Sequence, residues 1–201
     1  TLGAKTEAEF FDPVKILLKI GYPKEKLILL PIVRDPRKTL ASWRNMWEDL
    51  NLEKFIRSYT LIYKIKKESQ VLGIKTIPYV HEAIRDQSSD IVINKLFKII
   101  GLKKNITKDI INWNNGPKFG EENPGISNLK FYDIPPEKFI REVREWGSYK
   151  YKNEPNLKLS LKDVLFLKKK IIVKDIYEEF RRECQNCLNL EIKPFDSINY
   201  W

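Results

Sequence analysis

The sequence predicts an α/β fold with a parallel sheet, and three observations support this prediction. Two short segments, residues 27–33 and 74–80, have the character of strands, and the first is almost unbroken apolar sequence. The longer segments around them have the 3.6-residue apolar period of amphipathic helices. The order strand, helix, helix, strand, helix is typical of parallel strands that are joined by helices.

The two predicted strands are too few to form a stable sheet on their own. Leu27–Val33 reads LILLPIV and has the composition of a strand that is buried on both faces. Pro31 is unfavourable inside it, because proline lacks the N–H that a ladder needs, and it fits a sheet edge or the irregular end of the strand better. Ile74–Val80 is the second strand. We therefore expect part of the domain to lie outside these 201 residues.

Periodic apolar residues predict six helices around these strands. The helices span residues 13–20, 39–50, 52–72, 91–100, 136–146 and 161–188. Three of them end at a glycine, which is the expected C-terminal stop: Gly21, Gly73 and Gly101. Ser89 and Asp90 are the candidate N-caps of the helix over residues 91–100. Residues 112–136 are rich in Asn, Gly and Pro and predict a long loop.

The composition is that of a globular chain with a basic surface. The hydrophobic fraction of 42%, with five Trp and ten Phe, excludes the aromatic-poor class of disordered chains. The 37 Lys and Arg outnumber the 27 Asp and Glu, which gives a net charge of +10. A basic surface attracts anions, but for most of these residues a solvated surface is the simpler interpretation, so charge alone selects no partner. No apolar stretch of about 18 residues is present, so no membrane span is encoded in these residues.

Cys184 and Cys187 form a C-x-x-C pair near the end of a predicted helix. A zinc site needs two more ligands, and the single histidine, His81, is far away in the sequence. We interpret the cysteines as ordinary helix residues, with a redox or disulfide role as the minority alternative. This cysteine usage demands no oxidising compartment, so the localisation stays open with the cytoplasm slightly favoured. The first residues contain neither an initiator Met nor a signal-peptide pattern, and we expect further chain upstream.

The most informative segment is the turn that follows the first strand. Arg34 comes directly after the apolar run, and ligands of open α/β sheets gather at this carboxyl end. Ser42 comes eight residues later, in the next helix, whose start offers free N–H groups and positive dipole to an anion. Arginine supplies charged donors that match two phosphate oxygens, and serine adds a neutral donor. Asp35 and Pro36 fit the helix start, and Arg37 either reaches the same anion or stays in solvent.

On spacing alone, an ordinary helix start in which Arg34 pairs with an acidic neighbour is the simpler interpretation. The whole string VRDPRKTLASW, residues 33–43, favours another, because it resembles the 3'-phosphate-binding motif of sulfotransferases that use 3'-phosphoadenosine-5'-phosphosulfate (PAPS). The resemblance implies that Arg34 and Ser42 bind the 3'-phosphate, with Arg37 as a further candidate. It also implies one sulfotransferase-like domain over residues 1–201. The implied fold is P-loop-like with three layers, a central parallel sheet flanked by helices and a helix-rich C-terminal part.

A second segment, KTEAEFFDP over residues 5–13, is similar to the K-T-P-x-Y-F-x-x-P segment of the heparan-sulfate-type and related bacterial members. Glu7 replaces the family's Pro and Glu9 its Tyr. In the family the Lys lies near the transferring sulfuryl group, which implies a catalytic role for Lys5. A fixed cation there stabilises the charge that builds on the sulfuryl oxygens. A disordered terminal lysine is the alternative of equal weight.

A third segment, residues 76–102, resembles the family's strand, Y-E-D-L, helix and closing F-L-G-L, with H-E-A-I at residues 81–84. Only one acid of the family's pair is present, so the resemblance passes no role to Glu82. His81 is a candidate catalytic base, because the ordinary pKa of histidine is near neutral. A packed or surface histidine is the simpler alternative.

Beyond residue 102 the resemblance fades. The loop over residues 114–125 stands where the family closes a basic, glycine-containing loop over the nucleotide, and Lys118 and Gly120 are its candidate remnants. A plain surface loop is the simpler alternative. No segment resembles the family's loop for the 5'-phosphosulfate or the base that often follows it. We expect both to lie upstream, unless the chain is a degenerate relative.

The resemblance implies an enzyme that transfers the sulfuryl group of PAPS to a hydroxyl or amine and releases adenosine 3',5'-bisphosphate. The acceptor would be a small molecule or a carbohydrate; no metal is required, we expect no nucleic-acid partner, and the oligomeric state stays open. The alternative is a non-catalytic module that binds nucleotides or other anions on a degenerate sulfotransferase fold. A P-loop kinase-like enzyme is a third option, but the G-x-x-x-x-G-K-[ST] that it requires is absent.

Overall fold

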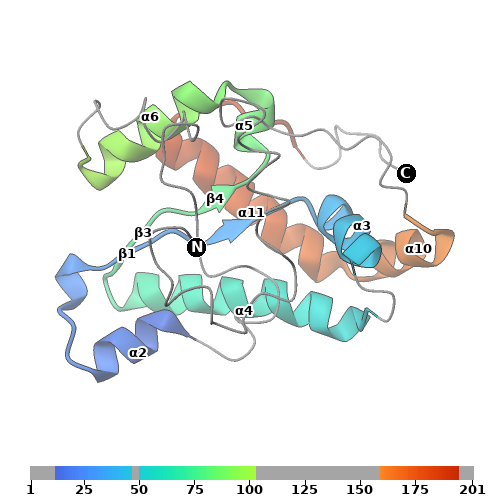
Figure 1. The fold of residues 1–201 in the computed structure, drawn as a ribbon, viewed down its shortest axis with the longest axis horizontal. Helices are drawn as coiled ribbons and strands as arrows, with labels where there is room; N and C mark the ends of the chain where they lie inside the picture. Colours follow the sequence, from blue (N-terminus) through green and yellow to red (C-terminus); the bar gives the residue numbers. More distant parts are fainter. Residues whose placement is uncertain (1–11, 47–49, 103–158, 195–201) are drawn as a thin grey trace, which may run out of the picture. The chain divides into compact units, whose positions relative to one another are not determined.

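The computed structural model describes residues 12–46, 50–102 and 159–194 (Figure 1). Within them the chain is mixed α/β and mostly helical, with two small parallel sheets of two strands each. The chain divides into two compact units, Thr1–Gln87 with Asn153–Trp201, and Ser88–Lys152. The single domain over residues 1–201 stays a prediction beside this division.

The first unit contains both predicted strands, each in two short pieces. The pieces are β1 (Ile28–Leu29), β2 (Ile32–Val33), β3 (Lys75–Thr76) and β4 (Tyr79–Val80). β1 pairs in parallel with β3, and β2 pairs in parallel with β4. Ile28 faces Lys75 and Ile32 faces Tyr79, so both pairs keep one register, since 75 − 28 = 79 − 32 = 47. The parallel arrangement that the sequence predicts is therefore confirmed.

Pro31 explains why this ladder is interrupted. Its carbonyl accepts a hydrogen bond from Tyr79 N at 3.0 Å, so the chain stays in register through the proline. Proline has no N–H to return, and one rung of the parallel ladder is lost at that point. The sequence marked Pro31 as unfavourable and favoured an edge or an end for it, but the structure places it between the two pieces of the strand.

Helices account for most of the described residues. The first unit contains α2 (Pro13–Lys19), the 3₁₀ turn η1 (Lys24–Lys26), α3 (Pro36–Met46), α4 (Leu52–Val71), α5 (Ala83–Asp86), α10 (Leu161–Lys169) and α11 (Ile171–Leu188). The second unit contains α6 (Ser89–Ile100). None of the described helices is long and apolar enough to span a membrane.

Helices α4 and α11 pack against the strands and against each other. α4 contacts β3, α11 contacts β4, and α11 also contacts α4 and α3 (Figure 1). The buried residues of α11 recur at helical spacing and form one stripe: Val173, Ile176, Tyr177, Phe180, Cys184 and Leu188. Cys184 is buried in this stripe and Cys187 is exposed, and both are free thiols within α11. The interpretation of the two cysteines as helix residues is confirmed.

A buried lysine ties α4 to α11. The Lys66 side chain is 0% exposed, and its Nζ lies 2.8 Å from Glu179 Oε1 and 2.7 Å from Glu183 Oε1. The same ammonium lies 4.8 Å from the centre of the Phe180 ring. Lys67 reaches Glu179 from the solvent side at 2.6 Å. Burial alone would raise the pKa of Glu179, but the hydrogen bonds from Lys66 and Lys67 outweigh it and lower this pKa to about 2.

The C-terminal ends of α4 and α6 follow the sequence, whereas the N-cap of α6 needs a correction. Gly73 and Gly101 follow the ends of α4 and α6 with φ of 75° and 81°, the left-handed conformation that glycine adopts without strain. Ser89 and Asp90 were expected to cap α6, but the N-cap is Ser88, whose side chain makes no capping hydrogen bond. Serine is favoured at N-caps, and three polar residues in a row leave the boundary ambiguous from sequence.

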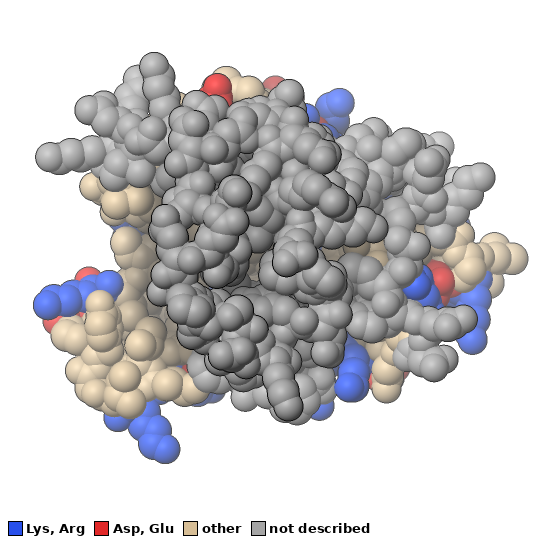
Figure 2. Space-filling model, in the orientation of Figure 1, with Lys and Arg blue, Asp and Glu red and all other residues tan. Residues whose placement is uncertain are grey.

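The basic residues of the described part are spread over its surface (Figure 2). Lys and Arg stand in several separate groups on the face that Figure 2 shows. Several of them pair with acids on the same or neighbouring helices, including Lys15 with Glu68 at 2.7 Å and Arg44 with Asp163 at 2.9 Å. This pattern agrees with the interpretation that most basic residues form a solvated surface.

Candidate functional site

The candidate site lies at the carboxyl ends of β2 and β4. Arg34 follows β2, and His81 follows β4. The His81 N–H donates to Val33 O at 2.9 Å, which continues the parallel ladder by one rung past both strands. Arg34 and His81 therefore occupy neighbouring positions at the same edge of the sheet, where open α/β sheets bind ligands. The predicted position of Arg34 at a strand end is confirmed.

Asp35 caps the helix that begins at this edge. Its Oδ1 accepts a hydrogen bond from Arg37 N at 2.9 Å, and its carbonyl accepts from Thr39 N at 2.9 Å. Pro36 is the first residue of α3, a position where the missing N–H of proline costs nothing. The predicted cap is confirmed, but α3 begins at Pro36 and not at Thr39 as predicted. α3 directs its positive N-terminal end toward the site.

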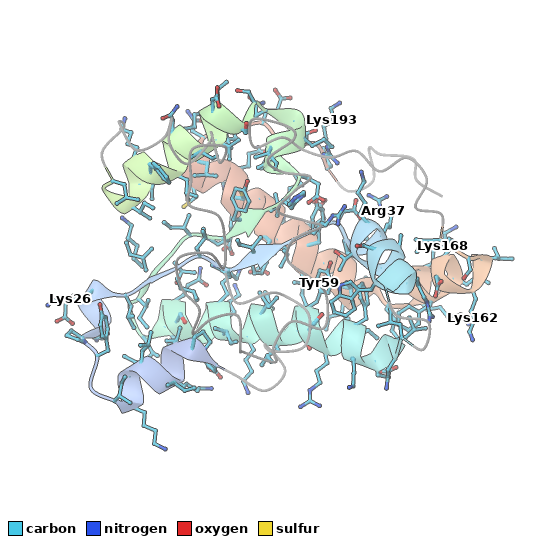
Figure 3. All side chains as sticks on the ribbon, viewed as in Figure 1. Lys26, Arg37, Tyr59, Lys162, Lys168 and Lys193 are labelled. Carbon is cyan, nitrogen blue, oxygen red and sulfur yellow. The ribbon has the colours of Figure 1, made fainter. Side chains whose placement is uncertain are left out.

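Arg37 is the residue of the turn that pairs with an acid. Its side chain is 2% exposed, with Nε 3.0 Å and Nη2 2.6 Å from the two carboxylate oxygens of Asp35 (Figure 3). This is the two-pronged geometry in which arginine recognises a carboxylate. The guanidinium thus neutralises the cap inside its own turn. A contact of Arg37 with a bound anion stays a prediction.

Arg34 is held by its backbone, whereas its guanidinium has no acidic partner among the described residues. The Tyr59 hydroxyl of α4 donates to Arg34 O at 2.6 Å and lies 2.9 Å from Thr39 Oγ1 (Figure 3). The Nε of Arg34 is buried and makes no hydrogen bond within the described part of the chain. A buried, unsatisfied donor is unfavourable in a protein and calls for an explanation. A bound anion would supply the missing acceptor.

Glu82 lies beneath this turn, fully buried at 0% exposed. Its Oε1 accepts a hydrogen bond from Asp35 N at 3.0 Å, and its Oε2 accepts from the Tyr177 hydroxyl of α11 at 3.2 Å. Burial, together with the nearby Asp35 carboxylate, raises the pKa of Glu82 to about 7. Near neutral pH a large share of Glu82 is therefore uncharged.

His81 lies close enough to Arg34 and Lys38 to feel their positive charges. Burial, together with the nearby charges of Arg34 and Lys38, lowers its pKa to about 4. The imidazole is therefore neutral at pH 7. A neutral imidazole can accept a proton, but a base with a pKa near 4 is weak, because general bases work best near the operating pH. A catalytic role for His81 stays a prediction.

Ser42 lies two turns into α3 and is partly buried. Its hydroxyl makes no hydrogen bond to any described residue, and no interaction joins it to Arg34 directly; its role as a phosphate donor stays a prediction. The other two site candidates, Lys5 and Lys118, lie outside the described residues. Within the described ranges, no group of three or more His, Cys, Asp or Glu is placed to hold a metal ion.

Sequence reasoning did not identify three residues that shape this edge: Tyr59, Glu82 and Tyr177. Glu82 carried one usable signal, because an acid that follows a buried strand within two residues is rarely left unpaired if it is buried. Tyr59 and Tyr177 carried none, since both read as members of amphipathic helix stripes. Their polar ends meet the turn only when α4 and α11 pack against it.

Comparison with protein families, with curated proteins and with solved structures finds no match for this chain.

Proposed function

We propose that this chain is a sulfotransferase domain that binds PAPS and transfers its sulfuryl group to a hydroxyl or amine of a small-molecule or carbohydrate acceptor. One observation supports this most directly. Arg34 stands at the carboxyl end of β2, with a buried Nε that lacks an acceptor among the described residues, next to the N-terminal end of α3. A guanidinium and a helix start together form a site for a phosphate.

The 3'-phosphate of the donor is the group that would occupy this edge. Arg34 would contact two of its oxygens, and Ser42 would donate from α3. Arg37 keeps the Asp35 cap neutral, so the acid of the turn does not repel the phosphate. The proposal requires the finer architecture that the family has, a P-loop-like three-layer fold in which β1 to β4 belong to a larger central sheet.

The proposed reaction is an in-line displacement at sulfur. An acceptor oxygen or nitrogen forms the new bond to sulfur while the bond from sulfur to the bridging phosphate oxygen breaks, and adenosine 3',5'-bisphosphate leaves. A base takes the acceptor's proton. His81 is a weak candidate for this base because of its lowered pKa. Lys5 would stabilise the charge on the bridging oxygen, while the 3'-phosphate site positions the donor.

The second candidate is a non-catalytic module that binds nucleotides or other anions at the same edge. The observation that favours it is the lack of a sequence resembling the 5'-phosphosulfate loop among the 201 residues. Turnover separates the two candidates. An enzyme releases adenosine 3',5'-bisphosphate from PAPS in the presence of acceptors, whereas a module binds the nucleotide and leaves PAPS intact.

Calorimetric titration of Arg34→Ala tests the proposal. We expect the variant to bind adenosine 3',5'-bisphosphate more weakly than wild type by roughly 2 kcal/mol, because a charged hydrogen-bond partner is lost. Adenosine 5'-monophosphate, which lacks the 3'-phosphate, should bind both proteins alike. Ser42→Ala should act in the same direction with a smaller effect. Arg182→Ala, at an exposed position of α11, is the control for lost charge. Equal losses for both nucleotides in Arg34→Ala would contradict the assignment.

A further inference from the structure

The turn that presents Arg34 is held from below by a single acidic side chain. Asp35 N donates to Glu82 Oε1 at 3.0 Å across 47 residues of sequence, and Glu82 is completely buried. Asp35 is the residue directly after Arg34 and caps α3. The hydrogen bond therefore fixes the peptide that links the end of β2 to the start of α3.

The other carboxylate oxygen of Glu82 connects this turn to α11. Tyr177 donates its hydroxyl to Oε2 at 3.2 Å, and Tyr177 is itself buried. Two further contacts hold the same turn, since Tyr59 of α4 donates to Arg34 O and Thr39 Oγ1 donates to Asp35 O at 3.1 Å. The backbone on either side of the Arg34–Asp35 peptide bond is thus clamped between α4 and α11.

The charge around Glu82 leaves Arg34 available to a ligand. The groups whose charges act on Glu82 or feel its charge come from the turn after β2, from α4, from α5 and from α11: Arg34, Asp35, Tyr59, Arg85, Tyr177 and Cys184. Arg37 forms an ion pair with Asp35 and neutralises its charge, and Asp86 does the same for Arg85. Burial disfavours the charged form of Glu82, so its carboxyl group competes less with an incoming anion for the guanidinium of Arg34.

We propose that Glu82 is a positioning residue for the Arg34 anion site: its carboxyl group holds the N–H of Asp35 and so sets the direction in which the strand-to-helix turn presents Arg34. This inference rests on the proposed function and deepens it, because it names the group that pre-organises the 3'-phosphate site. Glu82 touches neither the phosphate nor the reacting atoms. It acts through the backbone of Asp35.

Three substitutions of Glu82 separate positioning from simple support of the fold. Glu82→Gln keeps an acceptor for Asp35 N, whereas Glu82→Met keeps the volume and removes the acceptor, and Glu82→Ala removes both. We expect Glu82→Gln to bind adenosine 3',5'-bisphosphate within about threefold of wild type, since the acceptor is retained. Glu82→Met and Glu82→Ala should bind it at least about tenfold more weakly, with adenosine 5'-monophosphate affected less than about threefold. Circular dichroism melts identify which variants are folded at the titration temperature.

A double-substitution cycle with Arg34→Ala provides the sharper readout. If Glu82 acts by placing Arg34, Glu82→Met should cost no further affinity for the bisphosphate once Arg34 is alanine. Rescue by Glu82→Gln together with this lack of additivity supports the inference. It is overturned if Glu82→Met binds as wild type does, if Glu82→Gln loses as much as Glu82→Met, or if both nucleotides weaken equally.

The same titrations separate this inference from the function beneath it. If Arg34→Ala fails to discriminate between the two nucleotides, the 3'-phosphate assignment itself is wrong. If Arg34→Ala discriminates and Glu82→Met does not, only the positioning role of Glu82 is wrong. Should Glu82→Ala not fold, the Met and Gln variants carry the comparison.

Discussion

His81 and Glu82 are neighbours in the sequence, and burial drives both toward their uncharged forms. The pKa of His81 falls to about 4 and that of Glu82 rises to about 7. At neutral pH the positive charge of this edge therefore comes from Arg34 and Lys38 and not from the imidazole. A site of this kind favours a ligand with concentrated negative charge, such as a phosphate.

The lowered pKa of His81 predicts a loss of stability in acid. The unfolded chain takes up a proton on His81 below about pH 6.5, while the folded chain resists until about pH 4, so stability is present above 6.5 and is lost as the pH falls toward 4. We expect His81→Gln to lose roughly 2 kcal/mol less than wild type between pH 7 and pH 4.5, after allowance for the partial exposure of the ring. Urea unfolding at the two pH values measures this difference, and parallel losses in both proteins would show that His81 is not responsible.

At this scale the sequence predicts positions better than contacts. Arg34 at a strand end and Asp35 with Pro36 at a helix start follow from local chemistry, and both are confirmed. The sequence does not predict which arginine of R-D-P-R pairs with the aspartate, because this depends on side-chain direction. In the structure Arg37 makes the pair. Glu82 had no visible partner, because its hydrogen bonds reach residues 47 positions back and 95 positions ahead.

The interface between α4 and α11 offers a matched pair of lysines. Lys66 and Lys67 bind the same Glu179 carboxylate, but the Lys66 side chain is 0% and the Lys67 side chain 45% exposed. The two adjacent lysines therefore allow a buried and an exposed ion pair with the same carboxylate to be compared.

We expect Lys66→Met to lower the free energy of unfolding by roughly 3 kcal/mol, because Glu179 and Glu183 keep their charges next to an apolar side chain. Lys67→Met should cost less than about 1 kcal/mol, as exposed pairs do. The pKa of Glu179 is held near 2, so the stability that this carboxylate contributes is present above about pH 4.5 and is lost toward pH 2. The difference in the free energy of unfolding between wild type and Lys66→Met should therefore become smaller in acid. Denaturant titrations of both variants test this, and similar costs at the two positions would refute the role of burial.

At the scale of elements the apolar period predicts helices well and their interruptions poorly. The helices over 13–20, 52–72 and 91–100 match α2, α4 and α6 closely. The segment 161–188 was predicted as one helix, but it breaks at Lys170, with φ −98° and ψ 64°. Neither Gly nor Pro marks this break, so the sequence offers no local reason for it. α5 has only four residues, too few for a period to be read.

The net charge of +10 has a kinetic consequence for the whole molecule. A basic surface accelerates the arrival of anions, and salt screens this effect beyond roughly 10 Å at 0.1 M. We expect the association rate of adenosine 3',5'-bisphosphate to fall about threefold or more between low and ~0.5 M NaCl. Adenosine 5'-monophosphate carries less charge and should slow less. Stopped-flow binding of both nucleotides measures the two salt dependences, and identical dependences would argue against electrostatic attraction of the 3'-phosphate.

The two prolines of the strands determine on which side the sheet can grow. Leu29, Pro31 and Val33 turn their carbonyls toward the strand over 74–80, so the intervening residues, Leu30 and Ile32, direct intact N–H and C=O groups the other way. On the far flank of that partner strand, Pro78 has no N–H to give, and Val80 hydrogen-bonds to Cys184 of α11. An additional strand would therefore pair fully along Leu30 and Ile32 and would lose a rung beside Pro78. If such a strand pairs in parallel along Leu30 and Ile32, the loop that follows it lies near Arg34.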